Sequence, residues 1–177
     1  TWSIYLPFQV NSPKIDIAEF LFSEDINPGS TVEAFIQLEN TGNLDGSNIT
    51  IELISSSNLI NIQNNNINFG DIEQNTIAIS DEPVILTFNN TILNGTILPI
   101  EVNVTDDNGY NRSNFINLTV GQVTTQDPLG PNQYGYYIYD IYDVDYDLKP
   151  VFDWIEIDPQ YGGNGIDLNL SDGGDGN

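Results

Sequence analysis

Apolar and polar residues alternate with a period of two along much of the chain, which is the pattern of strands that bury one face. Five runs show it clearly: Val32–Leu38, Ile49–Leu53, Val84–Phe88, Leu98–Val104 and Ile116–Val120. Clusters rich in Asn, Gly, Asp and Pro separate the runs, at 27–30, 40–43, 94–95 and 106–109. No stretch shows a helical period. Several short strands at this spacing predict an all-β fold built as an antiparallel β-sandwich.

Two segments flank the predicted sandwich, which we assign to residues 13–120. Residues 1–12 form an extended apolar strand whose alternate residues share one face: Trp2, Ile4, Leu6 and Phe8. Residues 121–177 are rich in Tyr and Asp, predict short strands over 134–142, 151–157 and 166–170, and end in an acidic, Gly-rich tail. Three strands make a poor core. We therefore expect a smaller β unit that is incomplete, packed on the sandwich, or completed by another chain.

The composition excludes several classes of function. The chain carries 26 acidic and 3 basic residues, a formal net charge of −23, and no Cys, His or Met. Without Cys and His it has no disulfide framework, no thiolate zinc site and no Ser-His-Asp or Cys-His catalytic unit, so we expect no enzyme. So few Lys and Arg residues argue against nucleic acid and anionic membranes as partners. No apolar stretch is long enough for membrane insertion. Because the chain begins at Thr1 without a signal-like segment, we expect a mature chain or an excised piece.

Closely spaced Asp residues predict calcium, and we expect no other cofactor. Such spacing on a loop can turn several carboxylates toward one hard cation. One candidate group comprises Asp140, Asp143, Asp145 and Asp147, and a second in the tail comprises Asp172 and Asp175. Neither has the full spacing of the helix–loop–helix calcium motif. The alternative is a solvated acidic edge that deters aggregation between sheets.

Two aromatic features point to contacts rather than catalysis. Six Tyr residues crowd a short stretch: Tyr134, Tyr136, Tyr137, Tyr139, Tyr142 and Tyr146. They fit either a contact surface for carbohydrate or protein, or the core of the small unit. Glu156 beside Trp154 suggests a glycosidase carboxyl, but nothing places a second carboxyl at a defined separation from it. We therefore expect no catalytic residue.

Seven Asn residues stand in Asn-x-Ser/Thr sequons: Asn48, Asn89, Asn94, Asn103, Asn111, Asn117 and Asn169. That is about twice the number that chance gives for this composition. Asn48, Asn103 and Asn117 fall opposite the apolar positions of their strands, where a glycan has room. The sequence thus predicts N-glycosylation, with plain Asn enrichment as the alternative.

Five turn motifs stand out in the predicted sandwich: Asn27–Thr31, Leu38–Gly42, Phe69–Ile72, Asn94–Thr96 and Val104–Gly109. Together they resemble the CARDB-type immunoglobulin-like accessory module over about residues 13–120. The resemblance implies a non-catalytic sandwich of seven strands, common in large secreted prokaryotic proteins.

A second resemblance rests on Asp127–Tyr137 and Trp154–Ile157. These stretches are similar to segments that follow such modules in gingipain-type cysteine peptidases and related large cell-surface proteins. The resemblance implies further strands after the acidic loop, beginning with a Leu-Pro-Phe run, whereas this chain carries Leu6-Pro7-Phe8 near its other end. The peptidase domain, with its Cys and His, is absent, so the activity does not carry over.

These features predict an extracellular, cell-surface module with a structural or adhesive role. One form is a fibre subunit that assembles head to tail, with Trp2, Ile4, Leu6 and Phe8 of one copy completing the small β unit of the next. Alternatively, residues 1–12 close an upstream domain or pair with residues 121–177 of the same chain. The second candidate function is a carbohydrate- or protein-binding accessory module of a secreted peptidase or glycosidase. Expected partners are copies of the chain, neighbouring modules or a glycan.

Overall fold

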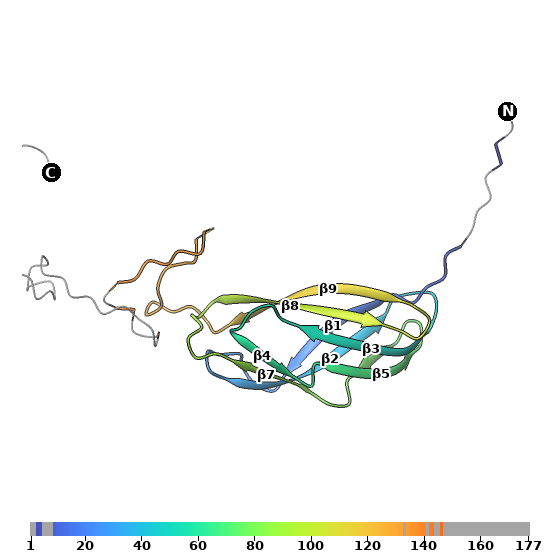
Figure 1. Ribbon diagram of the computed structural model, residues 1–177, viewed down its shortest axis with the longest axis horizontal. Coiled ribbons are helices and arrows are strands. Elements are labelled where there is room, and N and C mark those ends of the chain that lie inside the picture. The colour runs from blue at the N-terminus through green and yellow to red at the C-terminus, as the bar shows by residue number, and fades with distance from the viewer. Residues whose placement is uncertain (1–2, 5–8, 133, 141, 144–145, 147–177) are drawn as a thin grey trace, which may run out of the picture. The chain divides into compact units, whose positions relative to one another are not determined.

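The computed structural model describes residues 3–4, 9–132, 134–140, 142–143 and 146, and the chain divides into two compact units, Thr1–Thr124 and Thr125–Asn177. Among the described residues nine strands form, all in the first unit: β1 (Ile15–Phe22), β2 (Thr31–Asn40), β3 (Gly46–Ile54), β4 (Ile60–Gln63), β5 (Asn66–Ile72), β6 (Ile77–Ile79), β7 (Val84–Phe88), β8 (Thr96–Thr105) and β9 (Asn111–Val120) (Figure 1). This described part has no helix, and so none that could cross a membrane.

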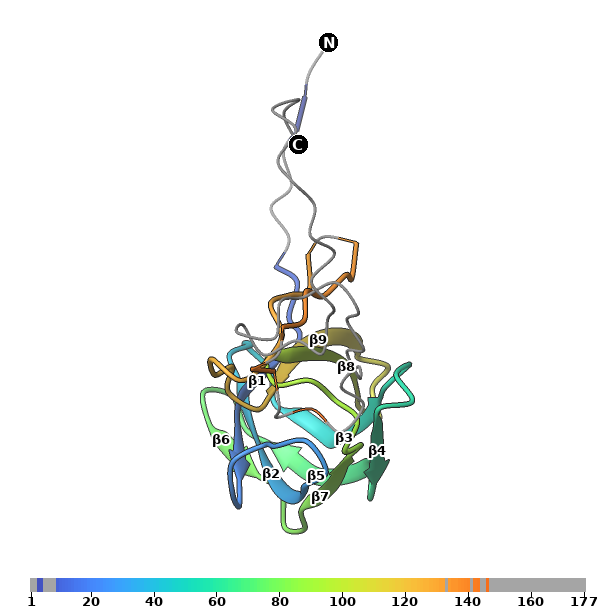
Figure 2. The same cartoon turned by 90° about the vertical axis from the view of Figure 1, so that its left-hand side faces the viewer.

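The strands form the two antiparallel sheets of a β-sandwich (Figure 2). One sheet has the order β1-β2-β7-β4, with β6 pairing a further stretch of β2, and the other has the order β5-β3-β8-β9. The predicted all-β fold is therefore confirmed, and the five alternating runs lie in β2, β3, β7, β8 and β9. The alternation did not single out β1, β4, β5 and β6.

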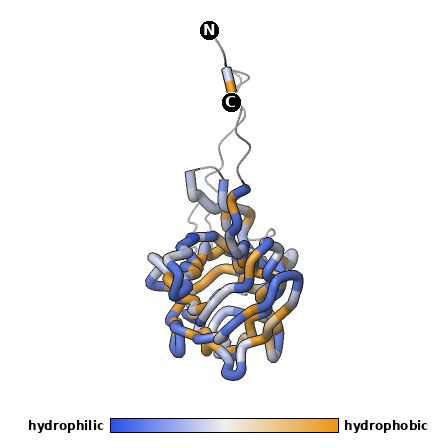
Figure 3. The backbone as a smooth tube through the Cα atoms, turned by 90° about the vertical axis from the view of Figure 1, so that its right-hand side faces the viewer, coloured by the Kyte–Doolittle hydropathy of each residue, from blue (hydrophilic) through white to orange (hydrophobic). Residues whose placement is uncertain are grey.

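The core lies between the two sheets and is built mainly from β-branched residues. On β2 the alternate residues Val32, Ala34 and Ile36 are fully buried, and so are Ile49 and Ile51 on β3 in the opposite sheet. Figure 3 shows hydrophobic positions along the strands inside the sandwich and hydrophilic loops around it. Burying one such side chain contributes about 1.5–3 kcal/mol, so this alternation accounts for most of the driving force for folding.

One end of the sandwich is tied together by a buried amide, that of Asn40 at the last position of β2. Its side chain has no solvent exposure. Its Oδ1 accepts hydrogen bonds from the backbone amides of Lys14 (3.1 Å) and Gly42 (3.0 Å). Its Nδ2 donates to the carbonyls of Leu44 (2.8 Å) and Ile72 (3.0 Å). Because Ile72 ends β5, this one side chain joins the two sheets.

The chain enters and leaves the sandwich at opposite ends. β1 begins beside the turn between β8 and β9, where the amide of Ile15 donates to the hydroxyl of Tyr110 at 3.1 Å. β9 then runs for ten residues, about 33 Å. At its far end the amide of Gly121 donates to the carbonyl of Ile26 at 2.8 Å. The connections of the first unit therefore lie about one strand length apart (Figure 1).

In the second unit the prediction of a strand over 134–142 is wrong for the described residues. The amides of Tyr134 and Tyr136 both donate to Oδ1 of Asn132, and Gly135 has a positive φ of 83°, so the chain turns here. An isolated β-bridge joins Leu129 and Ile138 across this turn. The predicted strands over 151–157 and 166–170 lie outside the described residues.

Candidate functional site

The first predicted calcium group is only partly described. Asp143 is buried, and its Oδ2 accepts a hydrogen bond from the amide of Asp140 at 2.5 Å. Oδ1 of Asp140 in turn accepts from the amide of Tyr142 at 2.7 Å. Both carboxylates thus hold a turn of the backbone. Nothing in the described ranges forms a metal-binding group of three or more His, Cys, Asp or Glu residues. The remaining candidates lie outside those ranges: Asp145, Asp147, Asp172 and Asp175.

Three of the sequons lie on the outward face of the β8–β9 pair. Asn111 and Asn117 are exposed on β9, and Asn103 is half-exposed on β8 between the buried residues Val102 and Val104. In the strand register Asn103 pairs with Ser113 and Asn117 pairs with Pro99, and both of these partners are exposed. A glycan on Asn103 or Asn117 would therefore have room on this face.

The other sequons differ in how their side chains are held. The Asn48 amide lies between two partners: it donates to Oδ1 of Asp107 at 3.1 Å and accepts from Nδ2 of Asn68 at 2.7 Å. Asn89 is exposed in the loop after β7, and its Oδ1 accepts from the amide and the hydroxyl of Thr91, the third residue of its own sequon. Asn94 is half-buried in the loop before β8. Asn169 lies outside the described residues.

The predicted self-assembly strand is described only in part. Ile4 is 82% exposed, whereas Trp2, Leu6 and Phe8 lie outside the described residues. At the end of the strand, the amide of Ser12 donates to Oδ1 of Asn43 (3.0 Å) and its carbonyl accepts from the Asn43 amide (3.2 Å). Oδ1 of Asn11 also accepts from Nδ2 of Asn43 at 2.9 Å, so the chain is anchored to the sandwich from Asn11 onward.

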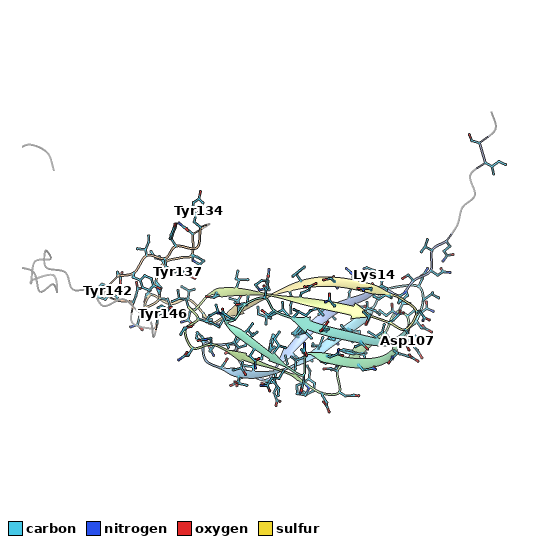
Figure 4. All side chains as sticks on the ribbon, viewed as in Figure 1. Lys14, Asp107, Tyr134, Tyr137, Tyr142 and Tyr146 are labelled. Atoms are coloured by element: carbon cyan, nitrogen blue, oxygen red, sulfur yellow. The ribbon has the colours of Figure 1, made fainter. Side chains whose placement is uncertain are left out.

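The tyrosines of the second unit divide into a packed group and an exposed group. The ring of Tyr139 lies 6.4 Å from that of Tyr137 and 6.2 Å from that of Tyr146. Burial raises the pKa of the Tyr139 phenol, and the neighbouring phenols and the Asp143 carboxylate raise it further. Exposed side chains lie on the turn itself, and we call them the hairpin surface: Leu129, Tyr134, Tyr136 and Ile138, each 71–73% exposed. Figure 4 labels Tyr134 of this surface.

The sequence patterns did not indicate a groove that lies between the free edges of the two sheets. Among the described residues β1 pairs only with β2 and β9 only with β8, so each sheet has an open edge. The end of β1 and the end of β9 together border a groove of about 940 Å³. Its apolar side chains include Phe20 and Phe22, and its carboxylates are those of Glu19, Glu24 and Asp25. The sequence feature that could have indicated this groove is the apolar run Phe20–Phe22, which is flanked by acidic residues.

At the opposite end an ion cluster links the two edges. Oδ1 of Asp16 on β1 lies 2.6 Å from Nη1 of Arg112 on β9, and Oδ2 lies 2.8 Å from Nζ of Lys14. Lys14 is labelled in Figure 4. The hydroxyl of Thr41 also donates to Oδ2 at 2.9 Å. Burial raises the pKa of the Asp16 carboxyl, but the hydrogen bonds from Lys14, Thr41 and Arg112 outweigh it, so the pKa lies below its ordinary value. The ion cluster thus bridges the gap between the edges at one end, and toward the other end the groove opens, where the Gly121–Ile26 hydrogen bond joins the end of β9 to the loop after β1.

Comparison with known proteins gives no family assignment. No protein-family model matches the chain, and no curated protein matches it. Among solved structures it is similar to the sporulation control protein Spo0M from Bacillus subtilis, with 13% sequence identity and a TM-score of 0.38. The alignment covers 64% of this chain and 51% of that one, so the chain spans about half the length of Spo0M. A likeness this low carries no argument about function.

Proposed function

We propose that the chain is a non-catalytic structural module of an extracellular, cell-surface protein, in which the sandwich separates the segments on either side of it. The observation that carries this proposal is the placement of the two connections at opposite ends of the sandwich. The residues that precede Ile15 leave from the end near Tyr110, and those that follow Val120 leave from the end near Ile26. A string of such modules extends lengthwise, which suits a surface stalk or an adhesin.

The strand geometry also suits a module under tension. Pulling through these two connections acts along β1 and β9, parallel to the strands. The hydrogen bonds of an antiparallel pair lie perpendicular to the strands, so the whole ladder resists together. The β8–β9 ladder extends over ten register pairs, from Thr96 with Val120 to Thr105 with Asn111. The Asp16–Arg112 ion pair additionally ties β1 to β9.

Single-molecule pulling of the full chain tests this role, and the lack of native Cys allows unique attachment points. Gln9→Cys with Gln122→Cys applies tension between the two ends of the sandwich. Ile97→Cys with Gln122→Cys instead opens the β8–β9 pair from its free end, one register pair after another. We expect a clearly higher unfolding force for the first pair at the same pulling rate. An equal or lower force would contradict the spacer role.

The extracellular location has its own test in the mass of the native protein. Asn103, Asn111 and Asn117 present their sequons on an open sheet face, so we expect glycan mass on at least one of them. The Asn48 side-chain amide is hydrogen-bonded to Asp107 and Asn68, so we expect less glycan at this sequon, and its occupancy is compared with that of the other three. A native mass equal to that of the 19.6 kDa polypeptide would show that the sequons carry no glycan and reflect only the high Asn content.

A fibre subunit is the finer form of this proposal, supported by the hairpin surface of the second unit. These exposed side chains flank a single β-bridge, Leu129 with Ile138, and therefore offer an apolar site for an added strand. Residues 1–12 carry no charged side chain, whereas residues 125–177 carry ten Asp and one Glu. Residues 1–12 of a second copy can therefore approach the acidic second unit without electrostatic repulsion between side chains.

Sedimentation of the full chain and of a chain lacking residues 1–10 tests strand addition. The truncation keeps Asn11 and Ser12, which bond to Asn43, so the sandwich should stay folded. We expect the full chain to form polymers and the truncated chain to sediment as a monomer. Polymers of the truncated chain, or a monomeric full chain, would exclude this assembly.

One observation favours the accessory-module alternative. Phe115 is 71% exposed on the outward face of β9, and the strand register places Glu101 opposite it. The hydroxyl of Ser113 donates to Glu101 at 2.7 Å. An aromatic ring beside a carboxylate and a hydroxyl group suits stacking on a sugar. Glycan-array binding that is lost in Phe115→Ala supports this function, whereas a glycan found on nearby Asn117 would cover the ring and exclude it.

A further inference from the structure

We infer that the groove between the ends of β1 and β9 binds an extended, Lys- or Arg-bearing segment of another protein. The groove belongs to the first unit and is independent of the spacer role. Its volume of about 940 Å³ is at the upper end of the range of ligand sites. Three features lead to this partner: an apolar base, an acidic rim without basic side chains, and open strand edges.

The apolar base comes from the inward face of β1. Phe20 and Phe22 pair with Ile36 and Ala34 of β2, which are fully buried, so both rings face the gap between the sheets. The rings stack at a centroid distance of 6.0 Å with an interplanar angle of 23° and pack against the core. Ile26 also lines the groove. This surface can contact apolar side chains and the hydrocarbon stems of Lys or Arg.

The rim is acidic and carries no positive charge. Glu19, Glu24 and Asp25 line the groove, and their side chains are exposed. The remaining polar lining consists of amides and a hydroxyl, with no Lys or Arg: Asn27, Asn94, Thr119 and Gln122. Three carboxylates around apolar rings complement the side chains of Lys and Arg. The positive charge of such a side chain is attracted weakly to each exposed carboxylate, and its hydrocarbon stem covers the rings.

A second copy of the chain does not supply this partner. The chain has three basic residues. Lys14 and Arg112 both hold Asp16, and the third is Lys149 in the acidic second unit. The apolar amino-terminal segment, residues 1–12, contains no Lys or Arg. Charge complementarity therefore points to a different protein.

The open edges decide how the segment lies. β1 and β9 are both edge strands in the described residues, and each has one side without a ladder partner. An extended peptide added along β1 satisfies its backbone there and turns alternate side chains toward the rings and toward the rim. The Asp16–Arg112 pair bridges the same gap at the other end, so within β1 the added strand pairs with the half that ends at Phe22.

Peptide binding to the full chain tests this inference. The probe is an acetylated peptide of about eight residues that alternates Lys and Val, about 26 Å long when extended. Titration by fluorescence anisotropy at about 150 mM salt screens long-range attraction by the net charge. A second peptide alternates Lys and Ser, with the same charge and no apolar contacts. We expect it to bind about tenfold more weakly, because it leaves the rings uncovered.

Two triple variants remove the same charge from different places. The groove variant carries Glu19→Gln, Glu24→Gln and Asp25→Asn, and its control carries three exposed changes elsewhere: Glu52→Gln, Glu73→Gln and Glu82→Gln. We expect the groove variant to lose about tenfold in affinity for the Lys-Val peptide and the control less than about threefold. Backbone amide shifts on binding should fall within residues 19–27 and 119–122.

Four outcomes would overturn the inference. Equal losses in both triple variants would show that net charge alone attracts the peptide. Equal binding of the Lys-Ser peptide would show that the rings do not contribute. Amide shifts that fall elsewhere would place the peptide on another surface. Shifts in residues 19–27 that depend on protein concentration, without peptide, would make a second copy the occupant.

Discussion

Replacing Asn40 by Asp tests how the two sheets are held at one end of the sandwich. The substitution changes an NH₂ group to an oxygen and leaves the shape almost unchanged. The acceptor contacts of Oδ1 with the amides of Lys14 and Gly42 remain possible. The two donor contacts, to the carbonyls of Leu44 and Ile72, are lost, and a carboxylate oxygen faces each carbonyl instead.

The magnitude follows from the complete burial of this side chain. An unsatisfied buried acceptor costs about 1–3 kcal/mol, and a buried charge without a partner costs about 3–5 kcal/mol, so we expect a loss of about 4 kcal/mol in the free energy of unfolding. For a unit of this size that corresponds to a fall of about 15 °C in Tm. Burial raises the pKa of the introduced carboxyl, so the loss grows as the pH rises above about 4 and shrinks below it.

The assay is urea and thermal unfolding of the full chain at neutral and acidic pH. Asn58→Asp is the matched control, because Asn58 is exposed and the change adds the same charge. We expect the control to stay within about 0.5 kcal/mol of the wild type. If Asn40→Asp and Asn58→Asp unfold within about 1 kcal/mol of each other at neutral pH, the buried amide does not hold the sheets together.

Three further predictions concern other parts of the chain. Asp16→Asn should cost about 1 kcal/mol at neutral pH, discounted for partial exposure of the cluster. Because the pKa of Asp16 is lowered in the folded state, this contribution is present above the ordinary Asp pKa and lost as the pH falls through the lowered one; urea unfolding across acidic pH checks the trend, and a pH-independent difference would contradict it. Gly42→Ala should cost about 1–3 kcal/mol by calorimetry, because a methyl group there overlaps the backbone of Ser12–Lys14; unchanged Tm would show that the backbone moves aside freely. If the group containing Asp140 and Asp143 binds calcium, replacing saturating calcium by a chelator should lower the Tm of the full chain, whereas an unchanged Tm excludes a stabilising site.

The sequence by itself determined the fold class through local chemistry. The period-two alternation of β-branched residues requires strands that bury one face, and the buried residues of β2 and β8 are those that the alternation indicates. The turns also follow from local chemistry: Oδ1 of Asp106 accepts from the amides of Asn108 and Tyr110, and Gly109 takes a positive φ of 90°. Such hydrogen bonds connect residues close in sequence, so no distant partner is needed to predict them.

Tertiary structure decided which strands are edges and what the polar residues do. The alternation of β1 is weak because Phe20 and Phe22 face a groove at the edge of the core rather than its centre, and a bulge interrupts its register between Ile17 and Glu19. In the sequence Asn40 is expected to start a turn, yet it ends β2 and joins two sheets, because its four partners include residues up to 32 positions away from it. The groove and the ion cluster likewise require β1 and β9, opposite ends of the sandwich sequence, to lie together. Contacts between residues so far apart in sequence depend on the packing of the whole sandwich, so a local sequence pattern does not predict them.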